Sequence, residues 1–143
     1  DADACPVKAE IYKVAIRHQV PVSIVSNSYM HVPESSLVKR IIVGAAFDAA
    51  DDYIAERAGE KTVVITGDIL LASRCIKAKA TVVAPSGKLF TEDSIGAAVA
   101  TRAIMEDLRA SGENHGGAQA FSKTDRSRFL SALHDALVRL QRL

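Results

Sequence analysis

Short apolar runs rich in Val and Ile alternate along this chain with stretches whose apolar residues recur at helical spacing. The runs predicted to be strands are residues 22–26, 38–43, 62–66 and 80–84. The stretches predicted to be helices are residues 6–19, 48–58, 69–79 and 94–110. Near-continuous Val and Ile content is typical of parallel strands that are covered by helices on both faces. The sequence therefore predicts a three-layer α/β/α fold with a mainly parallel sheet.

The whole chain of 143 residues is predicted to be a single domain, because a chain of this length buries a core of its own. Residues 94–143 are expected to form a C-terminal helical extension of that domain. Within it, Ser122 and Asp125 have the spacing of a capping box. The leucines that follow recur at a/d spacing and are expected to pack on the same domain: Leu130, Leu133, Leu137 and Leu140.

The composition excludes several classes of protein. The formal net charge of +1 gives no general attraction to nucleic acid. No apolar run approaches the length of a membrane span and no signal peptide is visible, so we expect a cytoplasmic protein with no membrane partner. Two distant cysteines, Cys5 and Cys75, do not suggest a disulfide framework or a zinc site. Cys5 is expected to be a small packing residue.

The start of the sequence raises a topological expectation. A doubly wound domain has a strand before its first helix, whereas here Asp1 stands directly before the helix predicted at residues 6–19. We therefore expect a few apolar residues to precede Asp1 in the protein. Asp1 and Asp3 would then lie just past the carboxyl end of a first strand.

Aspartates follow three of the expected strands, and the carboxyl ends of parallel strands meet at one edge of a sheet. Clustered carboxylates raise one another's pKa unless a cation compensates, and oxygen ligands suit Mg²⁺ or Mn²⁺. Such ions activate water and stabilise the leaving oxygen of a phosphodiester. The predicted metal ligands are Asp1, Asp3, Asp51 and Asp68.

Asp48 and Asp52 lie in the same predicted helix as Asp51. Asp52 or Asp48 would help in catalysis or orient water. Aspartate near a helix N-terminus is also an ordinary cap, and that interpretation stays open for each of these residues. Four further residues are candidates for substrate binding, with structural alternatives for all of them: Lys8, Asn27, Thr66 and Arg126.

Four ordered motifs, DADACPVK, VGAAFDAADDYIAE, VVITGDILLA and the late GG…FSKTDR, span nearly the whole chain. Together they resemble the uncharacterised bacterial YaiI/YqxD family, in which the first motif usually follows an apolar strand. That family is distantly similar to PIN-like and NYN nuclease domains. There, an Asp ends the first strand, an acidic residue lies in a central helix, and another follows a later strand.

The resemblance implies a role for each matching aspartate. Asp1 and Asp3 match the first acidic position, Asp51 the second with Asp52 beside it, and Asp68 the third. The leading hypothesis is a Mg²⁺- or Mn²⁺-dependent nuclease, acting on RNA, in which a metal-bound hydroxide attacks phosphorus.

Two alternatives stay open. The pair Asp1 and Asp3 also resembles the haloacid dehalogenase phosphatases, where they would be nucleophile and acid/base, with Ser26 or Thr66 binding phosphate. The other alternative is a non-catalytic module that binds nucleic acid or a protein. It would use residues 123–143, which carry five Lys or Arg against two Asp, and the aspartates would then be caps.

Overall fold

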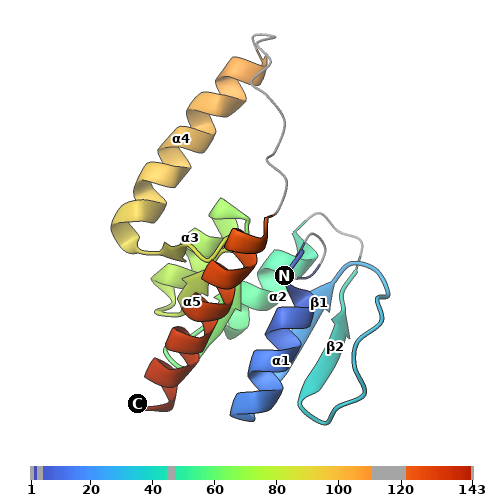
Figure 1. The fold of residues 1–143 in the computed structure, drawn as a ribbon. Helices are drawn as coiled ribbons and strands as arrows, with labels where there is room; N and C mark the ends of the chain where they lie inside the picture. The colour runs from blue at the N-terminus through green and yellow to red at the C-terminus, as the bar shows by residue number, and fades with distance from the viewer. Residues whose placement is uncertain (1, 3–4, 45–47, 111–121, 143) are drawn as a thin grey trace.

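The computed structural model describes residues 2, 5–44, 48–110 and 122–142, and the side chains of residues 102–110 are not part of that description. Helices and strands alternate through most of the chain (Figure 1). In chain order they are α1 (Lys8–His18), β1 (Val22–Ser26), β2 (Val38–Ile42), α2 (Ala49–Arg57), β3 (Val63–Ile65), α3 (Ile69–Lys77), β4 (Thr81–Val83), β5 (Leu89–Phe90), α4 (Glu92–Ala110) and α5 (Lys123–Gln141).

Every strand and helix expected from the apolar pattern is present, with its ends within about two residues of the expected ones. α4 begins earlier than expected, at Glu92, because Thr91 and Ser94 cap its first turn. The N–H of Thr91 donates to Oγ of Ser94 at 2.8 Å, and the N–H of Ser94 donates to Oγ1 of Thr91 at 3.1 Å. β5 was not expected, since two residues give no periodicity to recognise.

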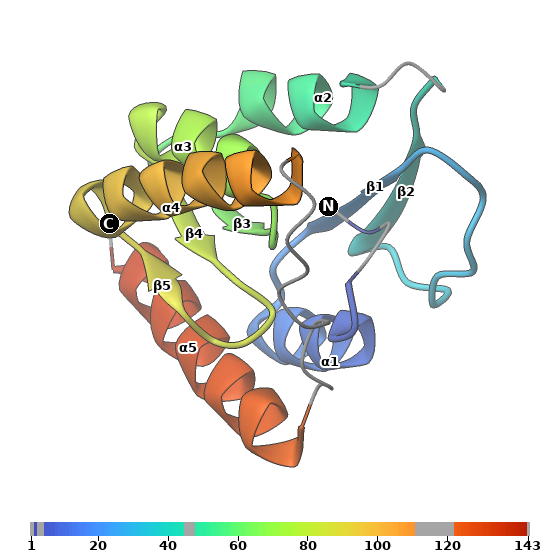
Figure 2. The same cartoon turned by 90° about the horizontal axis from the view of Figure 1, so that it is seen from above.

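The strands form two small sheets in the described part of the chain rather than one continuous sheet. β1 and β2 are parallel over five residue pairs, from Val22 opposite Val38 to Ser26 opposite Ile42. β3 and β4 are parallel, and β5 adds an antiparallel edge to β4. The expected parallel character is present in both sheets, and the fold is mixed α/β. Seen from above, α1 and α5 lie on one side of the strands, and α2, α3 and α4 on the other (Figure 2).

Apolar side chains fill the space between helices and strands on both sides. On the α1 and α5 side, Phe129, Leu133 and Leu137 pack with Ile11 and Val83. On the other side, the buried residues come from β3, β4, α3 and α4: Val64, Leu71, Ala72, Cys75, Ile76, Val82 and Ile95.

The expected leucine stripe of α5 is only partly a core seam. Leu133 and Leu137 are buried, whereas Leu130 is 36% exposed. Phe129, one residue earlier, is fully buried in its place. The seam nevertheless packs on its own domain, because these side chains belong to the cluster shared with α1 and β4.

Polar contacts fix α5 against α1 along its length. Near the start of α5, Nη1 of Arg126 lies 2.6 Å from Oε1 of Glu10. Further along, Nε2 of His18 and Nδ1 of His134 are 3.0 Å apart, and Nε2 of Gln141 donates to the carbonyl of His18 at 3.1 Å. These contacts hold α5 against α1.

The N-terminus of α5 has the capping box that the sequence predicts. Oγ of Ser122 accepts from the N–H of Asp125 at 3.1 Å, and Oδ2 of Asp125 accepts from the N–H of Ser122 at 3.0 Å. α4 and α5 are each 19 residues long. Among the described residues, no helix combines the length and apolar character needed to cross a membrane.

Candidate functional site

Asp68 lies between β3 and α3 and is the N-cap residue of α3. Its Oδ1 accepts hydrogen bonds from the N–H groups of Leu70 at 2.9 Å and Leu71 at 3.2 Å. Its own N–H donates to Oγ1 of Thr66 at 3.0 Å, and Thr66 is 1% exposed. Three hydrogen bonds therefore hold Asp68 at the carboxyl end of β3. The capping interpretation holds for Asp68, and it leaves the carboxylate in place at the predicted sheet edge.

The other candidate carboxylates belong to the start of α2. Asp48 is the N-cap residue of α2 but its side chain makes no capping hydrogen bond. Asp51 and Asp52 lie in the first turn of the same helix, which packs against α3. Asp51 is partly buried and is influenced by the neighbouring carboxylates, whereas Asp52 is exposed.

The electrostatics of Asp51 show that these aspartates are neighbours. Burial raises the pKa of Asp51 above its ordinary value, and the negative charges of Asp68 and Asp48 raise it further. The positive charge of Arg74 opposes the rise, and Asp52 adds a smaller contribution in the same direction as the other aspartates. The structure thus brings α2 and the β3–α3 junction together into one negatively charged region.

Arg74 is a member of this region that was not identified from the sequence. Its Nη1 lies 2.9 Å from Oδ1 of Asp52, and both side chains are about half exposed, at 46% and 54%. The hydrogen bond with Asp52 is the largest cause of the raised pKa of Arg74. One feature of the sequence could have pointed to Arg74: it is a basic residue on α3, the helix that Asp68 caps.

Asp1 and Asp3 lie outside the described residues, so the structure does not place these two predicted ligands. Ala2, between them in sequence, is 3% exposed and donates its N–H to the carbonyl of Val25 on β1 at 2.9 Å. Within the described part of the chain, no three His, Cys, Asp or Glu side chains are gathered closely enough to hold a metal ion. The described aspartates alone therefore do not form a metal site.

The candidates for substrate binding all make structural contacts. Nζ of Lys8 donates to the carbonyl of Cys5 at 3.2 Å, which holds the lysine against its own helix start. Nδ2 of Asn27 donates to the carbonyl of Gly44 at 3.1 Å and joins the segments that follow β1 and β2. Thr66 supports the backbone of Asp68, and Arg126 is paired with Glu10. The hydrogen bond of Thr66 is made to Asp68, one of the candidate carboxylate residues.

Both cysteines are buried and unbonded to one another. Cys5 is 8% exposed and belongs to the cluster with Val7 and Phe129, as expected for a packing residue. Burial raises the pKa of the Cys75 thiol. A buried neutral thiol is a poor nucleophile, so Cys75 is not a candidate catalytic residue.

Comparison with known proteins gives matches along nearly the whole chain. A family described as "Uncharacterized BCR, YaiI/YqxD family" matches residues 1–139. A UPF0178 protein of Bradyrhizobium diazoefficiens is 59% identical over 142 residues, which cover 99% of this chain and 85% of that protein. A UPF0178 protein of Nitrobacter winogradskyi is 60% identical, with 99% and 90% covered. One of Sphingopyxis alaskensis is also 60% identical, with 99% and 93% covered. No solved structure matches the chain significantly.

Proposed function

Because this chain belongs to the YaiI/YqxD family, whose description carries no activity, we propose its function from its own residues: a Mg²⁺- or Mn²⁺-dependent nuclease that hydrolyses RNA. The proposal places the reaction at the carboxylates of α2 and the β3–α3 junction. In an open α/β sheet, ligands bind at the carboxyl ends of the strands, and Asp68 lies just beyond the end of β3, after Thr66 and Gly67.

The observation that carries the proposal is the crowding of negative charge around Asp51. A partly buried carboxylate next to Asp68 and Asp48 is costly to ionise, as its raised pKa records. Proteins retain such arrangements where a cation compensates, and perturbed carboxylates of this kind cluster at functional sites. The donor atoms are all carboxylate oxygens, which suits the hard ions Mg²⁺ and Mn²⁺.

In the proposed site, Asp51 and Asp68 hold the ion together with Asp1 and Asp3. The hydrogen bonds from Leu70 and Leu71 keep the Asp68 carboxylate aimed in one direction. When bound, divalent ions of this kind supply an activated water and stabilise the leaving oxygen of a phosphodiester.

The remaining two aspartates of α2 support the reaction. Arg74 pairs with the carboxylate of Asp52 at 2.9 Å and so favours a position of Asp52 beside the proposed ligands. From there, Asp52 or Asp48 orients the attacking water. In this proposal the substrate is RNA, and no side chain of the protein forms a covalent bond with it.

The same proposal includes a three-layer arrangement of PIN-like type. It is supported by helices on both sides of the strands, with α1 and α5 opposite α2, α3 and α4 (Figure 2). The phosphatase alternative relies on Asp1 and Asp3 and assigns no part to Asp51. Because the charge crowding centres on Asp51, the nuclease accounts for more of the observed site than the phosphatase does.

The experiment is cleavage of a fluorescent single-stranded RNA by the purified protein in Mn²⁺, for the wild type and for Asp51→Asn and Asp68→Asn. Asparagine caps a helix as well as aspartate does, so Asp68→Asn keeps α3 intact while removing the charge. The matched control is Asp93→Asn, at an exposed position in the first turn of α4. We expect a loss of about 100-fold or more in both site variants and none in the control. Equal cleavage by all four proteins would mean a contaminating nuclease and would refute the proposal.

A further inference from the structure

Two histidines that are 116 residues apart in the sequence meet at the surface of the domain. His18 is the last residue of α1, and His134 lies in α5. Nε2 of His18 and Nδ1 of His134 are 3.0 Å apart, and the ring centroids are 5.0 Å apart with 54° between the ring planes. His134 is exposed and His18 is partly exposed, so ions from solvent have access to the pair.

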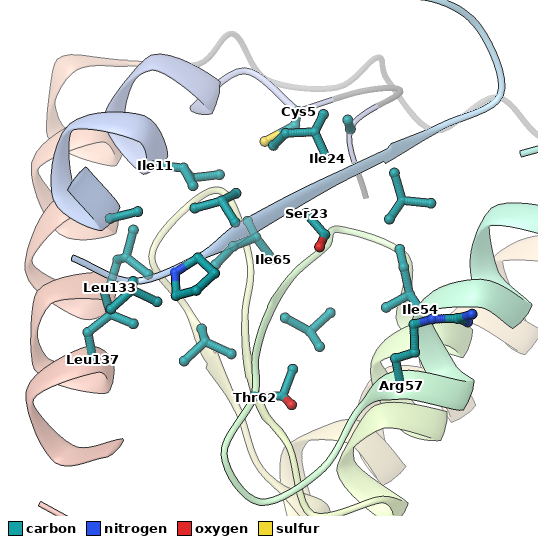
Figure 3. Close-up of a pocket in the computed structure, with 18 of the residues that line it drawn as sticks. Cys5, Ile11, Ser23, Ile24, Ile54, Arg57, Thr62, Ile65, Leu133 and Leu137 are labelled. Carbon is teal, nitrogen blue, oxygen red and sulfur yellow. The ribbon is translucent and has the colours of Figure 1, made fainter. Parts of the chain in front are cut away.

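The packing of α1 on α5 sets the position of the two rings. Ile11 of α1 belongs to the same buried cluster as Leu133 and Leu137 of α5. Figure 3 shows these three side chains together, on the side of the pocket that α1 and α5 form. Because Leu133 and Leu137 lie on either side of His134 in the sequence, a buried seam holds the backbone that carries its ring. The two imidazoles are thus presented by helices whose relative position is set by the core.

A further contact fixes the end of α1. Nε2 of Gln141 donates to the backbone carbonyl of His18 at 3.1 Å. Gln141 lies about two helical turns after His134, so the two side chains share a face of α5. His18 is therefore held to α5 through its main chain as well as its ring. Its ring can turn about the side-chain bonds while the end of the helix stays in position.

The hydrogen bond between the two rings contributes little by itself. Both rings are accessible to water, and a hydrogen bond that replaces bonds to water has a small net free energy. In the neutral pair, one ring donates and the other accepts. When the donor ring takes its other tautomer, both facing nitrogens carry a lone pair. Two such nitrogens side by side are a chelating pair for a metal ion that prefers imidazole ligands.

The spacing of the two nitrogens fits Zn²⁺. Zn–N bonds are about 2.0–2.1 Å long, and a tetrahedral angle then places two ligating nitrogens about 3.3 Å apart. The observed separation of 3.0 Å is close to that value, and a rotation of the exposed His134 ring supplies the difference. Imidazole suits Zn²⁺, whereas carboxylates suit Mg²⁺ and Mn²⁺. Among the described residues no third His, Cys, Asp or Glu joins the pair, so water takes the other positions.

We propose that His18 and His134 form a zinc site that clamps α1 to α5. Two Zn–N bonds replace the hydrogen bond between the rings, and the donor ring keeps its proton on its second nitrogen, so no proton is lost. Because the ligands come together only in the folded chain, bound Zn²⁺ stabilises the fold. The site contains none of the aspartates of the proposed nuclease and does not depend on that activity.

The test is a titration of the protein with Zn²⁺ against a chromophoric chelator, in excess Mg²⁺ to occupy carboxylate sites. His18→Gln, His134→Gln and the double variant remove the pair. The matched controls are His31→Gln and His115→Gln, which remove the other two histidines of the chain and leave the pair intact. We expect each site variant to bind Zn²⁺ at least about tenfold more weakly than the wild type, and both controls to bind like the wild type.

The double variant separates a shared ion from two independent imidazoles. One imidazole alone holds Zn²⁺ weakly, so the double variant should bind little more weakly than either single variant. Losses of binding free energy that add in full would contradict a shared ion. Affinity that is equal in the wild type and both single site variants, or no binding by the wild type, would also overturn the proposal.

Thermal unfolding supplies a second measurement. Zn²⁺ should raise the melting temperature of the wild type and the two controls, and leave that of the site variants unchanged. Melting without metal shows which variants fold, and the exposed His134→Gln decides the question if His18→Gln does not fold. Asp68→Asn should respond to Zn²⁺ like the wild type, so a failed nuclease proposal leaves this outcome unaffected. A rise of equal size in the wild type and His134→Gln would contradict the zinc site.

Discussion

The guanidinium of Arg74 on α3 lies 2.9 Å from the carboxylate of Asp52 on α2, at the edge of a region crowded with aspartates. The pair spans two helices that are consecutive in the chain on either side of β3. It also supplies positive charge beside Asp51, where Arg74 opposes the rise in pKa caused by burial and by the other aspartates. Arg74 therefore has two roles: it contacts the first turn of α2 through Asp52, and it opposes the rise in the pKa of Asp51.

Replacing Arg74 by glutamine should raise the pKa of Asp51 further, because the opposing charge is removed. Stability should change by no more than about 1 kcal/mol, since the ion pair is half exposed. The measurement is an NMR titration of the Asp51 carboxyl carbon. Arg57→Gln is the control, because Arg57 stacks on Tyr53 and is not among the charges that shift the pKa of Asp51. An unchanged midpoint in Arg74→Gln would contradict the assignment.

Asp51→Asn should make the protein more stable at neutral pH and above. Asp51 binds its proton more tightly in the folded chain than in the unfolded one, so the folded state holds more protons between the two pKa values. Raising the pH through that interval therefore lowers the free energy of unfolding, and the variant lacks this loss. We expect a melting temperature about 1–3 °C higher at pH 8.

The advantage of Asp51→Asn should shrink as the pH falls below the ordinary aspartate pKa, because the carboxyl is then protonated in both states. Thermal unfolding at several pH values, beside Asp93→Asn, gives the comparison. A variant that is less stable than the wild type at pH 8 and equally stable in acid would show that the ionised Asp51 stabilises the fold, contrary to the direction of its pKa shift.

Gly87 allows the turn between β4 and β5 to approach α5. Its φ is +90°, and a Cβ placed there would lie 2.6 Å from the carbonyl carbon of Arg128. Gly87→Ala should therefore cost about 2 kcal/mol or more, since backbone has to move and alanine disfavours that φ. Gly96→Ala is the matched control inside α4, where a Cβ meets nothing within 4 Å.

The control should stabilise by about 0.5–1 kcal/mol, because alanine favours a helix interior over glycine. Urea unfolding of both variants measures the change in the free energy of unfolding, which should be a decrease for Gly87→Ala and an increase for Gly96→Ala. If Gly87→Ala were as stable as the wild type, the close packing of the turn on α5 would be wrong.

Ser122→Ala should destabilise the protein by about 1 kcal/mol, because it removes the hydroxyl that accepts from the N–H of Asp125. Hydrogen bonds from Ser122 hold the pKa of Asp125 below its ordinary value. That depressed pKa adds stability above the ordinary pKa, and the contribution is lost as the pH falls through the folded value. Ser122→Asn keeps an acceptor at the cap and should be close to wild type in chemical denaturation. Equal losses in the two variants would argue against capping.

Local patterns in the sequence predicted most of the secondary structure. Val and Ile runs located all four longer strands, and the Ser122–Asp125 spacing located the start of α5. These features depend on neighbours in sequence, so they can be read without the fold. β5 was not predicted, because its two residues form a strand only through their pairing with β4.

Features that depend on distant contacts were harder to predict. The separation into two sheets depends on which strands pair across the fold, and no local pattern encodes that pairing. Phe129 takes the core position expected of Leu130, because the orientation of α5 is set by its contacts with α1. Arg74 was missed because its partner Asp52 lies 22 residues away. Asp51 and Asp68 were both predicted to be site residues, and that assignment stays a prediction, as does the placement of Asp1 and Asp3.

Calorimetric titration with Mn²⁺ at pH 7.5 tests the central claim most directly, since that claim is that the aspartates around Asp51 bind a divalent ion. The proteins compared are the wild type, Asp68→Asn and the control Arg57→Gln. We predict binding by the wild type and the control, and an affinity at least tenfold weaker in Asp68→Asn. Binding of equal strength in all three, or no binding heat and no Mn²⁺-dependent rise in melting temperature for the wild type, would contradict the claim.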